Sequence, residues 1–241
     1  MGADEKQAFR SRLIAIRNSL IRCAVAITVG VIIASIFSED ILGLLESPLK
    51  RNLGQNGTLI FTGLTDMIWI YIKLAFIFGI ILAAPYIFYE IWGFVSPGLK
   101  KAEKRGILPF VIISCMLFVG GALFGYFFVL PLAFKFFLGF ANEHIQALPS
   151  VKEYLSLSFK FLLAFGIVFE VPVLVFFLAR IGLVSVEGFR KSRKYAILMA
   201  FIIGAIFAPD VVSQFMMAIP IILLYEIGII VAWISGRKKK I

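Results

Sequence analysis

The chain has 241 residues, of which 61% are hydrophobic and 16% are charged, and its formal net charge is +10. A soluble globular domain carries roughly 45–50% apolar and about 25% charged residues, so this composition excludes an ordinary soluble domain. Only two cysteines are present, Cys23 and Cys115, which excludes a disulfide-rich secreted scaffold. The composition predicts a polytopic membrane protein whose positive charge reflects nucleic acid, anionic lipid or membrane topology.

Six apolar segments are candidates for transmembrane helices, because a helix needs about 20 mostly apolar residues to cross a core of about 30 Å. We expect the first to be kept as a helix, since a long charged region precedes it and the cleavage pattern after it is poor. The second and third exceed a straight crossing, and Pro85 and Pro131 are their predicted kinks. In chain order the predicted helices are 20–37, 67–95, 107–140, 154–179, 195–207 and 214–234.

The fifth segment is short, because 13 residues at about 1.5 Å each reach roughly 20 Å. Residues 208–213 join it to the sixth segment, and so short a connection predicts an antiparallel hairpin. The hairpin either spans a locally thinned bilayer or is re-entrant. Both alternatives leave its two ends on the same side of the membrane.

The basic residues gather in the loops of one side. Of the 24 lysines and arginines, 18 lie before or at the start of the first segment, between segments two and three, between segments four and five, or after the sixth. By the positive-inside rule both termini are therefore predicted to be cytoplasmic. The charge thus orients the helices and does not indicate nucleic-acid binding. Since no linker or internal repeat divides the chain, residues 1–241 are predicted to form one transmembrane domain.

Motifs for an enzyme are missing from the sequence. The dipeptide Gly-Lys of a phosphate-binding P-loop never occurs, and the single histidine, His144, lies in a predicted outer loop. We find no spacing of His, Cys, Asp and Glu typical of a metal site and no nucleophile with a base nearby. The sequence predicts a protein that is not an enzyme and needs no cofactor or metal.

Glu170 is the most informative acid, because it lies near the middle of the fourth segment. A carboxyl group at that depth costs several kcal/mol unless it is protonated, paired or hydrated. Pro172 leaves the carbonyl of Val168 without its helical donor, so two polar demands coincide at one depth. We predict an intramembrane polar site at Glu170 and Pro172. The alternative is a protonated acid that is hydrogen-bonded to a neighbouring helix.

Other polar residues also have two interpretations each, one functional and one structural. Glu103 stands among cations in the loop between segments two and three, where it is either a solvated charge or a carboxylate that binds a guanidinium. Asp210, Ser213 and Gln214 cluster at the outer hairpin tip, where turn and cap chemistry also accounts for them.

Five stretches of the sequence carry a family resemblance. They read APYIFYEIWGFVSPGL at 84–99, GALFGY at 121–126, FGIVFEVPV at 165–173, RKY at 193–195, and PDVVSQ at 209–214 with AIP at 218–220 and LYE at 224–226. Together and in this order they resemble TatC, the multispanning component of the twin-arginine protein translocase. The resemblance extends from about residue 12 to residue 228.

The resemblance implies a receptor and core subunit that binds twin-arginine signal peptides at the cytoplasmic face of the bacterial inner membrane. In the family pattern one acid of the first cytoplasmic loop and one of the N-terminal segment contact the arginine pair. Glu103 matches the loop acid, whereas Ala15 occupies the position of the N-terminal acid. The implied signal-peptide site comprises Glu103 together with Arg17, Lys101, Arg105 and Glu90.

The resemblance also implies partners and an energy source. Single-helix TatA/TatB-like proteins are expected to dock at Asp210, Ser213, Gln214, Tyr225 and Glu226, and self-association and contact with membrane lipid are expected too. Glu170 matches an acid that the family associates with a hydrated pocket. Export of folded proteins would use the protonmotive force.

Two other functions stay open from the residues alone. One is a proton-coupled secondary transporter with Glu170 as its proton site, although the missing internal repeat disfavours it. The other is a structural membrane scaffold without cargo, which would bind partner helices but no signal peptide.

Overall fold

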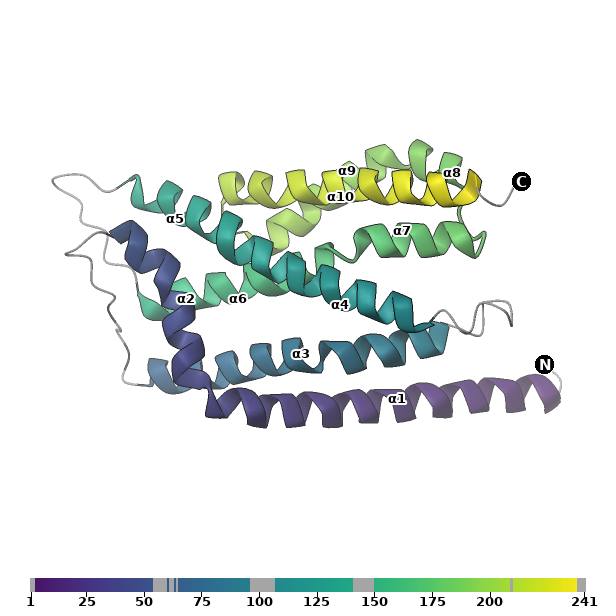
Figure 1. Ribbon diagram of the computed structural model, residues 1–241, viewed down its shortest axis with the longest axis horizontal. Helices are drawn as coiled ribbons and strands as arrows, with labels where there is room; N and C mark the ends of the chain where they lie inside the picture. The colour runs from purple at the N-terminus through teal and green to yellow at the C-terminus, as the bar shows by residue number, and fades with distance from the viewer. Residues whose placement is uncertain are drawn as a thin grey trace. The chain divides into compact units, whose positions relative to one another are not determined.

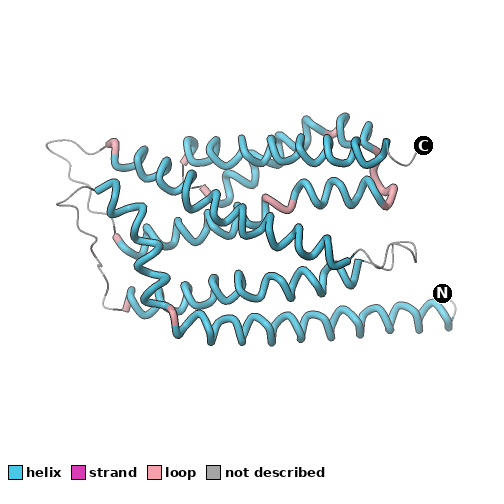
Figure 2. The backbone as a smooth tube through the Cα atoms, in the orientation of Figure 1, coloured by secondary structure: helices cyan, strands magenta, loops and turns pink. Residues whose placement is uncertain are grey.

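The computed structural model describes residues 3–53, 60, 63, 65–95, 107–140, 150–208 and 210–237, drawn as a ribbon in Figure 1 and as a tube in Figure 2. Within these residues the regular elements are helices, and one isolated bridge joins Ile60 to Ser150. The predicted all-α class is therefore confirmed. Five stretches of the described chain are long and apolar enough to cross a membrane: Leu13–Ile36, Asp66–Phe94, Leu108–Leu138, Val151–Arg180 and Val211–Ser235.

The helices extend or divide the predicted segments. Helix α1 (Ala3–Ile36) begins well before residue 20, because its charged first turns are helical although they are not apolar. Helix α3 (Asp66–Val95) runs through Pro85, and the third segment comprises α4 (Ile107–Phe124), the π-helical turn η3 (Gly125–Val129) and α5 (Leu130–Leu138). Pro131 lies in the first turn of α5, so the predicted irregularity takes the form of a π-turn before this proline.

Two short helices were not predicted as elements. Helix α2 (Ser38–Leu53) is amphipathic, with Glu39 and Asp40 in its first turn, where acids favour the positive end of the helix dipole. Helix α8 (Val186–Lys191) follows Gly182, whose φ of 77° is left-handed, and the Ser185 side chain caps it by accepting a hydrogen bond from Gly188 N at 3.0 Å. Neither helix is a long apolar run, so a search for membrane spans does not find them.

The described chain divides into two compact units, one of residues 1–42 and 68–115 and the other of residues 43–67 and 116–241. In the first unit α1 lies along α3 (Figure 1). A Cβ atom on Gly30 would lie 2.4 Å from the carbonyl oxygen of Gly79, so the two backbones nearly touch. Farther along α3, Trp92 donates from its indole nitrogen to Ser114 Oγ at 3.1 Å and packs on the Phe110 ring.

In the second unit α6 (Val151–Val168) packs against the end of α4 and against η3. A Cβ atom on Gly121 would lie 2.3 Å from the Phe165 carbonyl oxygen, and one on Gly166 would lie 2.8 Å from the Phe118 ring. The GALFGY stretch is therefore a helix-packing face, as small residues spaced by four predict. Tyr126 donates to the Leu44 carbonyl at 2.6 Å, which holds the end of α2 in this unit.

The fourth segment is broken at Phe169 and Glu170, between α6 and α7 (Val171–Arg180), and Figure 2 draws this break as a short loop. Proline at position 172 explains the break, because it removes the donor for the Val168 carbonyl. Helices α9 (Arg193–Phe207) and α10 (Val211–Arg237) follow one another almost directly and pack together. The predicted hairpin is thus present, and α9 has only 15 residues.

Candidate functional site

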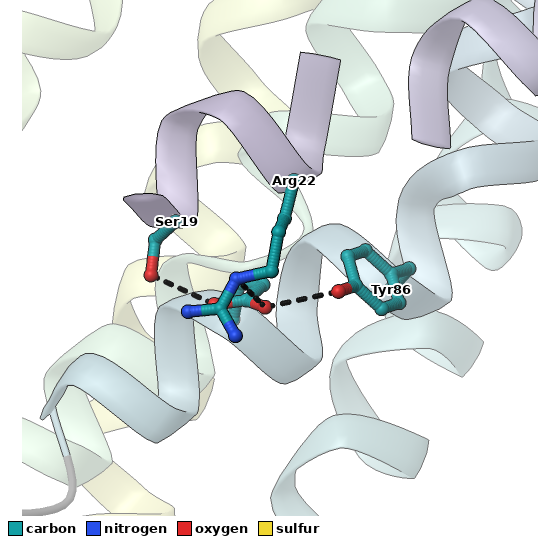
Figure 3. Close-up of polar contacts among 4 residues, drawn as sticks. Ser19, Arg22 and Tyr86 are labelled. Carbon is teal, nitrogen blue, oxygen red and sulfur yellow. Dashed lines mark hydrogen bonds and ion pairs between the residues drawn. The ribbon is translucent and has the colours of Figure 1, made fainter. Parts of the chain in front are cut away.

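Glu90, near the end of α3, has a buried carboxylate with three side-chain partners. Its exposed fraction is 8%, yet three side chains reach its carboxylate. Ser19 donates to Oε2 at 2.8 Å, Tyr86 donates to Oε1 at 3.1 Å, and Arg22 places its Nε 3.2 Å from Oε1. Figure 3 shows Ser19 and Arg22 on α1 and Tyr86 on α3 converging on this carboxylate. The site binds a guanidinium at the junction of two helices.

The spacing of these residues explains why they meet. Ser19 and Arg22 are three residues apart on α1, and Tyr86 and Glu90 are four apart on α3, so each pair shares one helix face. The sequence prediction named Glu90 but missed the three residues around it. The paired spacing on both helices was the available signal, but a single sequence does not show which two helices pack.

The remaining residues of the predicted signal-peptide site are placed in part. Arg17 is exposed on α1, with a weak 3.4 Å contact to the neighbouring Asn18. Ala15 is also exposed, one turn before Ser19 on the same face. The other three predicted residues, Glu103, Lys101 and Arg105, lie outside the described residues.

Glu170 lies where the helix is interrupted. Its backbone nitrogen donates to the Ile167 carbonyl at 3.0 Å, its carbonyl accepts from Leu174 N at 2.9 Å, and it precedes the first turn of α7. Its Oε1 atom is shielded from solvent. The acid and the proline-induced break of Pro172 therefore coincide in the described structure, within the apolar stretch Val151–Arg180.

The hairpin tip combines a helix cap with buried polar atoms. Asp210 caps α10, since its Oδ1 accepts from Ser213 N at 2.9 Å and its carbonyl accepts from Gln214 N at 3.0 Å. Gln214 also donates from Nε2 to the Phe201 carbonyl on α9 at 2.9 Å. Asp210 Oδ2 and Ser213 Oγ are buried without a hydrogen-bond partner among the described residues. Asp210 thus caps α10, while Asp210 Oδ2 and Ser213 Oγ remain without a hydrogen bond among the described residues.

Tyr225 and Glu226 do not join this cluster. They lie 11 to 16 residues farther along the chain in α10, which is roughly 17–24 Å at about 1.5 Å per residue. Tyr225 donates to the Phe189 carbonyl at 2.9 Å, and Glu226 accepts from Arg193 at 2.7 Å. These two residues connect α10 to α8 and to the start of α9, so the five predicted docking residues form two separate groups.

A metal site is not indicated, because no three His, Cys, Asp or Glu residues come together within the described part of the chain. The polar contacts between the described helices involve carboxylates, hydroxyl groups and arginines.

The sequence is similar to known proteins over most of its length. Residues 11–220 match the family model for the Sec-independent protein translocase protein (TatC). A TatC of Desulforapulum autotrophicum is 50% identical over 237 residues, covering 98% of this chain and 88% of the relative. The TatC of Escherichia coli K12 is 38% identical over 230 residues, covering 95% of this chain and 89% of the relative.

Solved structures agree with these relatives. A crystal structure of the twin arginine translocase receptor TatC superposes with a TM-score of 0.85 at 40% identity, covering 93% of this chain and 99% of that one. A second crystal structure of that receptor, in DDM, gives a TM-score of 0.84 at 41% identity. Similarity in sequence and in fold therefore extends over nearly the whole chain.

Proposed function

The chain belongs to the TatC family of Sec-independent protein translocase proteins, and from this premise we propose that it is the subunit that recognises twin-arginine signal peptides. Membership makes it a multi-pass membrane subunit of a protein translocase and not an enzyme. The proposal adds that recognition occurs at the cytoplasmic face of the inner membrane, with both chain termini on that side.

The observation that carries the proposal is the Glu90 carboxylate and its guanidinium. The buried Glu90 carboxylate near the end of α3 accepts hydrogen bonds from two hydroxyl groups and already contacts an arginine, Arg22, of α1. Paired arginine–carboxylate contacts are strong and orienting, which is the chemistry that recognition of an arginine pair requires. This supports a guanidinium-binding function for the α1–α3 junction.

Further residues complete the proposed site. Glu103 is proposed to supply a carboxylate from the first cytoplasmic loop, and Arg17, Lys101 and Arg105 are the basic residues of the same proposed site. The apolar part of a signal peptide inserts along the exposed apolar helix surfaces. A small-solute transporter that uses Glu170 is not favoured, since the matching family consists of protein translocases.

Site-specific crosslinking tests this proposal. A photo-reactive residue next to Glu103 is expected to crosslink to a twin-arginine signal peptide and to lose most of that crosslink when the arginine pair is replaced by a lysine pair. The same probe in a Glu103→Ala variant should give a weak product. Equal crosslinks to the arginine-pair and lysine-pair peptides, with full export by Glu103→Ala, would contradict the proposal.

We also propose that the α9–α10 hairpin tip docks single-helix TatA/TatB-like partners, with Asp210, Ser213 and Gln214 at its centre. The exposed apolar side chains of Val211 and Phe215 beside this tip support this, because a partner helix packed on them in a membrane would gain van der Waals contact. Single cysteines at the exposed Val211 or Phe215, with Cys23 and Cys115 replaced, are expected to form disulfides with a cysteine in the partner helix. A cysteine at exposed Leu223, on another face of α10, is the control, and equal yields there would contradict the docking site.

Tyr225 and Glu226 enter the proposal differently. Their contacts hold the start of α9 against α10, so they orient the hairpin and contribute to docking indirectly. Self-association of the chain is proposed as well, and the mass of the purified complex measures it.

Glu170 and Pro172 form the proposed polar spot in the membrane plane, and transport is proposed to use the protonmotive force. Glu170→Ala is expected to reduce export while the protein still accumulates in the membrane. In inverted vesicles an uncoupler should stop translocation. Translocation that continues at full rate with the uncoupler present would contradict the proposed energy source.

A further inference from the structure

We infer that Arg22 is an internal competitor for the signal peptide: it occupies the Glu90 carboxylate in the resting protein, and a guanidinium of the signal peptide displaces it. Glu90 thereby supplies, from α3, the second acid that the N-terminal segment lacks at Ala15. This inference rests on the proposed recognition of an arginine pair and adds the residue that regulates it.

The position of the carboxylate supports the first part. Ala15, Ser19 and Arg22 follow one another at intervals of four and three residues, so they share one face of α1. Ser19 binds Glu90 directly, and Ala15 lies one turn away, about 6 Å along the helix axis. Glu90 therefore places negative charge beside the part of α1 where Ala15 leaves none.

The carboxylate is prepared for a guanidinium even apart from Arg22. Ser19 and Tyr86 donate one hydrogen bond each and hold the two carboxylate oxygens in place. A carboxylate offers about four acceptor positions, so a second guanidinium can approach before Arg22 has left. Tyr86 is 39% exposed, which leaves the rim of the site accessible.

The Arg22–Glu90 contact is longer than two other ion pairs among the described residues. It uses Nε of Arg22 and measures 3.2 Å, whereas the Lys152–Asp66 and Arg193–Glu226 pairs measure 2.7 Å. The Arg22 side chain is 57% exposed, so water already solvates much of it. A fork of two parallel hydrogen bonds from an incoming arginine is stronger than this single contact.

Space for the exchange lies beside the pair. An open depression of about 360 Å³ is bordered by Asn18, Ile21 and Arg22 on α1. The released Arg22 side chain can swing toward this depression and stay hydrated, because long cationic side chains keep their charged ends in water. Displacement therefore requires a side-chain movement and no unfolding of α1.

A purely structural role for the pair makes different predictions. If Arg22 and Glu90 only fasten α1 to α3, loss of either partner loosens the same contact and changes peptide binding in the same direction. If Arg22 competes with the peptide, its loss strengthens binding, whereas loss of Glu90 weakens it. The two variants therefore distinguish a competitor from a fastening contact.

The experiment measures the affinity of the purified full-length protein in detergent for a fluorescent twin-arginine signal peptide. Arg22→Gln is expected to tighten binding about threefold to fivefold, as loss of a partly exposed ion pair allows. Glu90→Gln, which keeps the side-chain shape, is expected to weaken binding about tenfold. In the double variant Arg22→Gln should no longer tighten binding, because no charged carboxylate is left to release.

Lys152→Gln is the matched control, since it removes an ion pair whose cation is 50% exposed and which lies outside the proposed site. It should leave the affinity unchanged. An unchanged or weaker affinity of Arg22→Gln, while binding still requires the arginine pair, overturns the competitor role alone. Wild-type protein that binds arginine-pair and lysine-pair peptides equally well overturns the proposed function and this inference together. Elution of each variant at the wild-type volume in gel filtration checks that it is folded.

Discussion

Asp66, in the second unit, is a buried carboxylate that accepts hydrogen bonds from Lys152 and from the backbone of Gly63. It is 5% exposed at the start of α3, where its Oδ1 accepts from Lys152 at 2.7 Å and its Oδ2 accepts from Gly63 N at 3.0 Å. The contacts tie the start of α3 to the start of α6. Near them the bridge between Ile60 and Ser150 joins the same two stretches of chain.

We predict that Asp66→Asn lowers the melting temperature of the purified protein by about 2–4 °C. Hydrogen bonds to charged groups contribute roughly 1.5–3 kcal/mol, and asparagine keeps the bond to Gly63 while losing the ionic part of the Lys152 contact. We expect the free energy of unfolding to fall by about 1 kcal/mol, which for a chain of this size lowers the melting temperature by about 2–4 °C. Thermal unfolding in detergent measures it.

The comparison variant for this prediction is Lys152→Gln. Removal of the lysine takes a cation away from the buried Asp66 carboxylate, whereas Asp66→Asn leaves only a half-exposed lysine unpaired, so Lys152→Gln should cost at least as much stability. A smaller loss of stability from Lys152→Gln than from Asp66→Asn would contradict the role of this ion pair.

At the residue scale the sequence predicts chemistry better than it predicts contacts. Glu170 is identifiable from its depth and from the nearby Pro172, because a carboxyl group at that depth needs a compensating environment whichever neighbours supply it. Arg22 is different. In the sequence it is one more cation of the basic N-terminal region, and its contact with Glu90 joins residues 68 positions apart and depends on how two helices pack.

The contact between α1 and α3 depends on two glycines. A Cβ atom on Gly30 would lie 2.4 Å from the Gly79 carbonyl oxygen, and one on Gly79 would lie 2.6 Å from Val31 N. In both cases the obstacle is backbone, which cannot turn aside as a side chain can. The close approach lets the two helices pack in lipid, where van der Waals contact is the main attraction between them.

We predict that Gly30→Ala destabilises the protein by about 1–3 kcal/mol, because the helices must separate to admit the methyl group. Melting temperature in detergent measures the change. Gly120→Ala on α4 is the matched control, since nothing lies within 4 Å of a Cβ atom there. Alanine favours a helix over glycine by about 1 kcal/mol, so the control should be neutral or stabilising. Equal destabilisation by both variants would contradict the close approach.

At the element scale hydropathy and proline give most of the helices but not their exact extent. The apolar run of 67–95 corresponds closely to α3, because the whole helix is apolar. Helix α1 begins at Ala3, before the apolar run, and α2 has no long apolar run. A search for membrane spans misses both features, because charged or amphipathic turns also form helices. Pro172 predicts the break between α6 and α7, since the missing donor is a local property.

The charge of the whole molecule concerns orientation. Of its 24 lysines and arginines, 18 lie in segments that are predicted to face the same side of the membrane as both termini, and the formal net charge is +10. Cationic loops are retained in the cytoplasm during insertion, and this bias acts over short loops such as these. The sequence thus predicts an orientation that helix packing alone does not determine, because the same bundle can be inserted either way round.

Labelling of single cysteines tests this orientation. In a variant without Cys23 and Cys115, a cysteine in place of Lys152 should react with a membrane-impermeant maleimide added to intact spheroplasts, because the start of α6 is predicted to face outward. A cysteine in place of Lys238, in the basic C-terminal tail, should react only after the membrane is permeabilised. Each site is the control for the other: position 152 shows that the reagent reacts in intact spheroplasts, and position 238 shows that their membrane is intact. The reverse pattern would place the cations outside, and with them the proposed signal-peptide site, which would contradict the proposed cytoplasmic recognition as well as the orientation.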